Sequence, residues 1–318
     1  MKDTPYIDPQ MVPVLAAIKE RVATRTPMTA LSPEEMRKRV RNDFISWNEE
    51  APDISRIENF DIPGPYGSTK IRLYDTVPKT KELRPMLIYY HGGGWVIGDL
   101  DMEDRSLRQL AIASDCAILS IDYILAPEYK FPAPVEDCCS AVRWLVKHGK
   151  ELGLDVSRLA IGGGSAGANL ALATALSLRD SNELTARFLL FFYGVFSSSM
   201  DSESYGLFGN GDFGLSKEGM NFFQGLYLDN ADNKHHPLVS PIEADLTGLP
   251  PAFFSVAGLD PLRDDSRQLV EKLRMNNISA DMREYEGVIH GFMLMGRSID
   301  VANLAIEEAR AALKAGLG

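Results

Sequence analysis

Residues 158–167 read Arg-Leu-Ala-Ile-Gly-Gly-Gly-Ser-Ala-Gly, a short apolar run that leads directly into a Gly-x-Ser-x-Gly pattern. This pattern behind a strand is typical of a sharp turn from a strand into a helix, where side chains at the glycines would collide with the backbone. Such a turn exposes the serine hydroxyl above the edge of the sheet. The segment therefore predicts an α/β sheet and a nucleophilic Ser165.

A second motif, His-Gly-Gly-Gly-Trp at residues 91–95, follows the strand-like run at residues 86–90. The run His-Gly-Gly-Gly arises by chance far less often than Gly-x-Ser-x-Gly, so this motif is the more specific of the two. A flexible loop is the simpler interpretation, but three glycines after a strand indicate a backbone that approaches a ligand closely. We expect an oxyanion hole made by the backbone N–H groups of Gly92, Gly93, Gly94 and Ala166.

A serine hydroxyl is a weak nucleophile, so it needs a base that takes its proton. The sequence has five histidines. Four of them lie in the glycine loop, at the end of a helical pattern or in a polar stretch: His91, His148, His235 and His236. His290 follows the last strand pattern, where a loop at the carboxyl edge of the sheet could bring it to Ser165. We therefore expect His290 to be the base.

The acid that orients the base should lie between the serine and the histidine in the chain. Asp260 follows the strand-like run at residues 252–256 and satisfies this order. Asp264 is the alternative, although it falls within the next helical pattern, where an acid near a helix N-terminus is favourable in any case.

Short apolar or β-branched runs alternate with helical patterns through most of the chain, which predicts a mainly parallel, doubly wound sheet. These runs are residues 86–90, 117–123, 159–161, 188–193, 252–256 and 280–285. Residues 10–50 show helical spacing, and a hairpin is expected around the turn at residues 63–67. The interval 197–249 mixes polar clusters with aromatic residues, and a loop of that length indicates an inserted cap.

Composition narrows the classes of function. The chain has 318 residues and a net charge of −11, which argues against nucleic acid and anionic membranes as partners and favours a neutral or cationic small molecule. The longest apolar run, residues 188–196, is too short to span a bilayer. Residues 1–9 carry two acids and two prolines, so we expect no signal peptide and a cytoplasmic protein. Three cysteines form no disulfide framework and no metal motif.

With residues 122–128 (Asp-Tyr-Ile-Leu-Ala-Pro-Glu) and 131–134 (Phe-Pro-Ala-Pro), these motifs make the chain resemble the hormone-sensitive-lipase family of α/β-hydrolases, in particular the bacterial acetyl esterases. The resemblance implies an eight-stranded sheet and a triad of Ser165, Asp260 and His290. It also implies a helical cap, built from residues 1–50 and about 197–249, on a catalytic domain at residues 51–318. Many members have Asp or Thr before the nucleophile, whereas this chain has Gly164 and lacks any hydrogen bond from such a side chain.

The sequence thus predicts a hydrolase of carboxylic esters with short acyl chains, acting without a cofactor or metal. An amidase or formamidase would use the same triad on an amide bond, because the preferred leaving group depends on pocket shape. A non-catalytic small-molecule binder on the same fold is a further alternative, which the joint presence of Ser165, Asp260 and His290 disfavours. The sequence leaves open whether the chain forms a homodimer or binds a protein partner.

Overall fold

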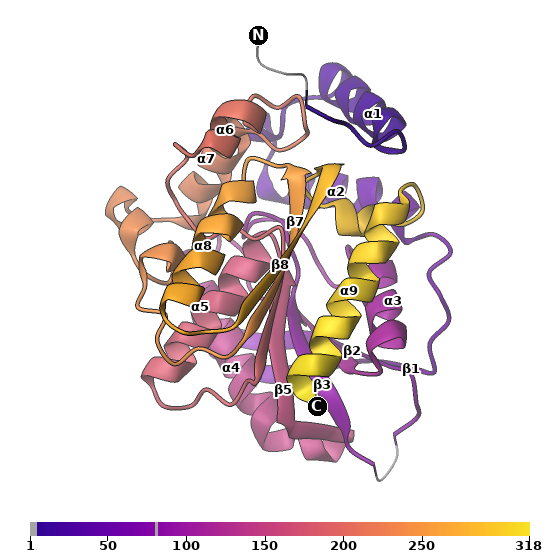
Figure 1. Ribbon diagram of the computed structural model, residues 1–318, viewed down its shortest axis with the longest axis vertical. Helices are drawn as coiled ribbons and strands as arrows, with labels where there is room; N and C mark the ends of the chain where they lie inside the picture. The colour runs from indigo at the N-terminus through magenta and orange to yellow at the C-terminus, as the bar shows by residue number, and fades with distance from the viewer. Residues whose placement is uncertain (1–4, 80–81) are drawn as a thin grey trace.

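The computed structural model describes residues 5–79 and 82–318, and within them eight strands form one sheet (Figure 1). The strands are β1 (Arg56–Gly64), β2 (Gly67–Asp75), β3 (Arg84–Tyr90), β4 (Ala117–Asp122), β5 (Leu154–Gly164), β6 (Phe188–Phe192), β7 (Ala252–Leu259) and β8 (Ala280–Ile289). Their order across the sheet is β1-β2-β4-β3-β5-β6-β7-β8. β2 pairs antiparallel with β1 and β4, and every other neighbouring pair is parallel. The predicted mostly parallel sheet is confirmed.

Helices cover both faces of the sheet (Figure 1). The helices are α1 (Met11–Thr24), α2 (Pro33–Asn48), α3 (Asp104–Ser114), α4 (Ala133–His148), α5 (Ala166–Asp180), α6 (Glu203–Phe208), α7 (Lys217–Tyr227), α8 (Arg263–Met275) and α9 (Asp300–Leu317). Short 3-10 turns are η1 (Met28–Ala30), η2 (Gly149–Leu152), η3 (Ala231–His235), η4 (Pro241–Glu243) and η5 (Phe292–Met295). α3 and α9 lie on one face, and α4, α5 and α8 lie on the other.

Two apolar clusters separate along the alternation of the strands, because successive side chains of a strand point to opposite faces. Along β3, Leu87 and Tyr89 join the cluster under α3 and α9, whereas Ile88 and Tyr90 join the cluster under α4 and α5. All four side chains are fully buried. This two-sided burial explains why the central strands read as nearly continuous apolar runs.

The predicted helical region at residues 10–50 contains α1 and α2, and α2 begins at a capping motif. Ser32 caps α2: its Oγ accepts a hydrogen bond from the Glu35 N–H, and the Glu35 carboxylate accepts one from the Ser32 N–H at 2.8 Å. Pro33 occupies the first helical position, where its missing N–H costs nothing. The predicted hairpin is also present, since β1 and β2 pair from Arg56 with Asp75 to Gly64 with Gly67.

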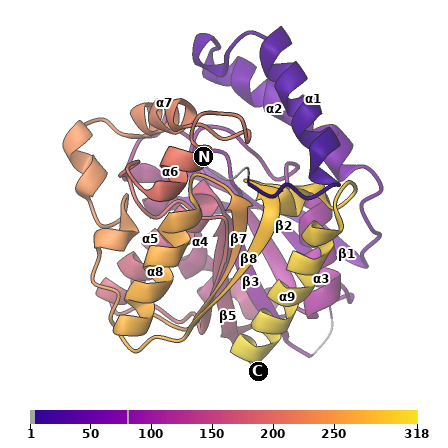
Figure 2. The same cartoon turned by 45° about the horizontal axis from the view of Figure 1, so that its top comes forward.

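The carboxyl ends of β3, β5, β7 and β8 share one edge of the sheet because these strands run parallel. The arrowheads of β7 and β8 point toward the end of the molecule where α1, α6 and α7 lie (Figures 1 and 2). α6 and α7 come from the interval 197–249, and α1 and α2 from the predicted N-terminal part of the cap, of which residues 1–4 lie outside the described residues. None of the described helices has both the length and the apolar character that crossing a bilayer requires.

Candidate active site

Ser165 forms the turn between β5 and α5. Its backbone has a φ of 54° and a ψ of −120°, a conformation that costs energy for any residue with a side chain. The Ser165 N–H donates to the carbonyl of Phe192 at 2.9 Å, which ties the turn to β6. A Cβ at Gly167 would overlap the carbonyl of Tyr90, so α5 can approach β3 only with glycine there. The turn thus holds a partly exposed serine at the carboxyl edge of the sheet.

His290 and Asp260 follow β8 and β7 and meet Ser165 at this edge. His290 Nε2 lies 2.9 Å from Ser165 Oγ, and His290 Nδ1 lies 2.7 Å from Asp260 Oδ2. The other oxygen of Asp260 accepts the N–H of Leu262 at 2.9 Å, and the residue is 1% exposed, so the carboxylate has a fixed orientation. The Tyr193 ring packs edge-on against the imidazole with centroids 5.0 Å apart.

The structure places the alternative acid elsewhere. Asp264 accepts the N–H of Ser204 at 2.8 Å and pairs with the guanidinium of Arg263 at 3.1 Å, so its carboxylate attaches α6 to the start of α8. The other histidines also lie in other surroundings: His91 stacks on Tyr123 with centroids 4.4 Å apart, and His235 contacts Glu243. The structure therefore brings Ser165, His290 and Asp260 together and leaves Asp264 out.

The prediction for the oxyanion hole is wrong at one residue of the glycine loop. The Gly92 N–H was expected to be free for an oxyanion, but it donates to Oε1 of Glu103 at 2.8 Å. Within residues 5–79 and 82–318, no protein acceptor takes the N–H groups of Gly93 and Gly94. Ala166 is the first residue of α5, where N–H groups have no acceptor within the helix. The donors that remain available are thus Gly93, Gly94 and Ala166.

Helices α2 and α7 hold the far end of the glycine loop. The Trp95 indole stacks on Tyr227 of α7, with centroids 4.7 Å apart and an interplanar angle of 3°. From α2, Arg37 donates to the carbonyl of Val96 at 2.9 Å and forms two hydrogen bonds with the Glu128 carboxylate. The hydrogen bond from Arg37 lowers the pKa of Glu128, which keeps this ion pair charged. The loop is therefore attached to both α2 and α7.

Phe223 of α7 lies directly over the glycine loop. A Cβ built on Gly94 would stand 2.7 Å from Cγ of the Phe223 ring, and Gly94 has a φ of +58°. Gly94 thus allows both the left-handed backbone and the close approach of the ring. An aromatic side chain at this place restricts the space beside Gly94.

The sequence did not reveal the roles of Glu103, Arg37 and Phe223 at the site. Glu103 lies among other acids just before a helix, which resembles an ordinary helix N-terminus, yet its side chain makes no capping bond. Arg37 lies on a charged helix and Phe223 in an aromatic helix, so neither stands out by residue type. Only the length and the aromatic residues of the interval 197–249 pointed toward a covering element.

The described residues contain no group of three or more His, Cys, Asp or Glu side chains that could hold a metal ion. Cys116, Cys138 and Cys139 are buried and form no disulfide.

An eight-stranded sheet of this order, with a serine, a histidine and an aspartate after β5, β8 and β7, defines an α/β hydrolase. A family model for the α/β hydrolase fold matches residues 87–294. An acetyl esterase of Salmonella schwarzengrund is 35% identical over 265 residues, which cover 82% of this chain and 80% of that protein.

Solved structures agree with these matches. An ester hydrolase from the metagenome of Lake Arreo, complexed with a bipyridine phosphonate derivative, aligns with a TM-score of 0.93 at 34% identity, covering 97% of this chain and 98% of that chain. The hyperthermophilic esterase of the archaeon Pyrobaculum calidifontis aligns with a TM-score of 0.92 at 30% identity and covers 98% of both chains. The chain belongs to the hormone-sensitive-lipase family of α/β-hydrolases and is a carboxylesterase.

Proposed function

We propose that the protein hydrolyses esters of short carboxylic acids, from acetyl to about hexanoyl, through an acyl-enzyme on Ser165. The observation that carries this proposal is the continuous pair of contacts from Ser165 Oγ to His290 Nε2 at 2.9 Å and from His290 Nδ1 to Asp260 at 2.7 Å. A carboxylate accepts hydrogen bonds, so Asp260 holds the Nδ1–H tautomer of His290. Nε2 is then free to accept the proton of the serine hydroxyl.

In the first half of the reaction, Ser165 Oγ attacks the ester carbonyl carbon while its proton moves to His290 Nε2. The carbonyl oxygen becomes an oxyanion, which the N–H groups of Gly93, Gly94 and Ala166 stabilise. Each donor of this kind contributes on the order of 3 kcal/mol to the transition state. The C–O bond to the alcohol then breaks, and Nε2–H gives its proton to the departing alkoxide.

In the second half, His290 takes a proton from water, whose oxygen attacks the acyl carbon. The bond to Ser165 Oγ breaks, the serine regains its proton from Nε2, and the carboxylic acid leaves. Every proton transfer uses the same nitrogen, since Asp260 engages the other nitrogen throughout.

The preference for short acyl chains rests on the proposed cap, residues 1–50 with about 197–249. The Phe223 ring lies against Gly94, so the space beside the oxyanion donors is narrow. The acetyl esterase among the relatives agrees with such a substrate. We also propose a cytoplasmic location, because buried, unpaired cysteines suit a reducing compartment.

The test is hydrolysis of p-nitrophenyl acetate, butyrate, octanoate and palmitate by the purified protein. We expect rapid release of p-nitrophenol from acetate and butyrate and background release by Ser165→Ala. Equal turnover of all four esters would contradict the chain-length proposal. Turnover of p-nitroacetanilide but of no ester would indicate an amidase, and activity retained by Ser165→Ala would overturn the assignment of the nucleophile.

A further inference from the structure

Glu103 is a buried carboxylate outside the triad. It is 2% exposed and precedes α3, although its side chain turns away from the helix end. Burial raises the pKa of this carboxyl, and the hydrogen bonds from Gly92 and Tyr89 offset that effect only in part. A buried acidic group is costly unless it is bonded, so its partners indicate what it does.

Both oxygens of Glu103 are engaged beside the nucleophile. Oε1 accepts the Gly92 N–H at 2.8 Å, and Oε2 accepts the Tyr89 hydroxyl at 2.6 Å. That hydroxyl would stand 3.1 Å from a Cβ built on Gly164, the residue before Ser165. Through Tyr89, Glu103 thus reaches the region behind the turn, where Gly164 contributes no side chain.

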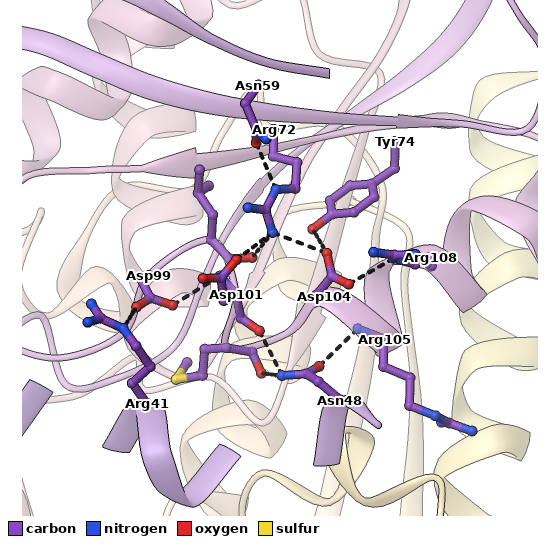
Figure 3. A network of polar contacts seen from close by, with 12 residues as sticks. Arg41, Asn48, Asn59, Arg72, Tyr74, Asp99, Asp101, Asp104, Arg105 and Arg108 are labelled. Carbon is purple, nitrogen blue, oxygen red and sulfur yellow. Dashed lines mark hydrogen bonds and ion pairs between the residues drawn. The ribbon is translucent and has the colours of Figure 1, made fainter. Parts of the chain in front are cut away.

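The segment that carries Glu103 is anchored on both sides (Figure 3). Before it, Arg72 of β2 pairs with Asp101 at 2.7 Å. After it, Arg72 and Tyr74 both bond to Asp104, at 3.2 and 2.8 Å.

Cap helix α2 adds a further anchor to the same segment. Asn48, at the end of α2, donates to the Asp101 carbonyl at 2.7 Å and accepts the Arg105 N–H at 3.0 Å (Figure 3). Glu103 therefore projects from a segment that is bonded to both β2 and α2 at the start of α3.

We propose that Glu103 is a positioning residue for the oxyanion hole: it fixes the first peptide of the glycine loop, so that the N–H groups of Gly93 and Gly94 keep their orientation beside Ser165. Three successive glycines have more backbone freedom than any other tripeptide, so the loop needs restraint at both ends. Trp95 and Tyr227 restrain the far end, and Glu103 restrains the near end. This inference rests on the proposed function, because the oxyanion in question forms when Ser165 attacks an acyl carbonyl.

The role predicts a distinctive kinetic effect. The negative charge on the carbonyl oxygen develops in the transition state, so disordered donors lower kcat and leave the binding of the neutral ester almost unchanged. A role confined to folding would instead lower the melting temperature and leave the kcat of the folded fraction intact.

The test compares Glu103→Met and Glu103→Gln with the wild-type full chain in hydrolysis of p-nitrophenyl acetate. Methionine fills nearly the same volume but cannot accept the Gly92 N–H well, so we expect kcat to fall roughly 10- to 100-fold with KM within about twofold. The amide oxygen of glutamine still accepts that N–H, so Glu103→Gln should keep kcat within about fivefold of wild type. The effect is thus assigned to the hydrogen bond rather than to the charge.

A p-nitrophenyl alkylphosphonate gives a second readout. Ser165 Oγ attacks phosphorus and p-nitrophenolate leaves, while the phosphoryl oxygen takes the place of the oxyanion. We expect Glu103→Met to slow this single turnover in proportion to kcat. The matched control is Asp75→Asn, which alters another buried carboxylate, at the opposite edge of the sheet, that pairs with Arg84. It should lower the melting temperature without changing kcat.

Wild-type kcat in folded Glu103→Met, or a loss confined to KM, would overturn the proposal for Glu103. If Glu103→Met does not fold, a Glu103→Gln variant as inactive as Ser165→Ala would overturn it as well. A wild-type protein without esterase activity would instead overturn the proposed function, so the two failures are distinguishable.

Discussion

Three aspartates within six residues have different surroundings and therefore different effects. Asp260 bonds to His290, Asp264 to Ser204 and Arg263, and Asp265 to the backbone after β6. Asparagine at position 260 would offer an N–H₂ group to Nδ1, which would favour the tautomer with its proton on Nε2. That nitrogen could not accept the proton of Ser165, so Asp260→Asn should lower kcat by roughly 10⁴.

The matched control is Asp264→Asn, four residues further along the chain. Its carboxylate contacts α6 and arginines but not His290, so we expect kcat within about threefold of wild type. Both variants are measured with p-nitrophenyl acetate at saturation. A larger loss in Asp264→Asn than in Asp260→Asn would reverse the assignment of the acid.

The sequence predicted which residues follow the strands, and the structure brings His290 within hydrogen-bonding distance of both Ser165 and Asp260. These three residues could be predicted because the serine motif, the order of the residues in the chain and the strand patterns can all be recognised in the sequence itself. The hydrogen bond between Gly92 and Glu103 could not be predicted, because it depends on how the chain folds over the 11 residues that separate them. The expectation for Gly92 was wrong for that reason.

At the scale of elements, the central strands were predictable because they are buried on both faces. β3, β4, β6 and β7 all begin or end close to the predicted bounds. β5 is longer than predicted: it runs from Leu154, although only residues 159–161 were expected. Three of the four residues at 155–158 are polar, and all four are at least partly exposed, so this part of the strand lacks the apolar signal that marked the rest.

Helix α7 offers a test of the proposed cap at the same scale. The Phe223 ring approaches Gly94, so Phe223→Ala should open space beside the oxyanion donors. We expect the ratio of kcat/KM for p-nitrophenyl octanoate to that for the acetate to rise by roughly tenfold, the value of about one or two buried methylene groups.

Phe222 is the matched control, because it neighbours Phe223 on the same helix with ring centroids 5.7 Å apart. Phe222→Ala removes the same number of atoms from α7. A general loosening of the helix would therefore change the chain-length ratio equally in both variants. An unchanged chain-length ratio in Phe223→Ala, or an equal change in Phe222→Ala, would show that Phe223 does not limit the acyl chain.

At the scale of the whole molecule, Asp265 attaches helix α8 to the chain where the interval 197–249 begins. The residue is 2% exposed, and one of its oxygens accepts the N–H groups of Phe196 and Ser197, each at 2.9 Å. Burial raises the pKa of Asp265 from 3.8 to about 8. The native protein therefore retains a proton here that the unfolded chain has lost at neutral pH.

This difference makes the free energy of unfolding depend on pH. Below pH 3.8 both states carry the proton, and the contribution of Asp265 is complete. As the pH rises toward about 8, the unfolded chain binds fewer protons than the native state, so the contribution declines. Above about 8 both states are ionised, and the contribution no longer changes. Asp265→Asn is neutral at every pH and lacks this dependence.

The difference in melting temperature between wild type and Asp265→Asn should therefore shrink steadily from pH 5 to about 8 and then level off. Asp264→Asn supplies the contrast. Burial opposes ionisation of Asp264, but the Ser204 N–H and Arg263 outweigh it and lower its pKa. Asp264 is thus ionised in both the native and the unfolded state in this range. The difference in melting temperature between wild type and Asp264→Asn should therefore stay constant. A constant difference for Asp265→Asn as well would mean that its carboxylate is ionised in the native protein. The two backbone N–H groups alone would then compensate for the burial of that charge.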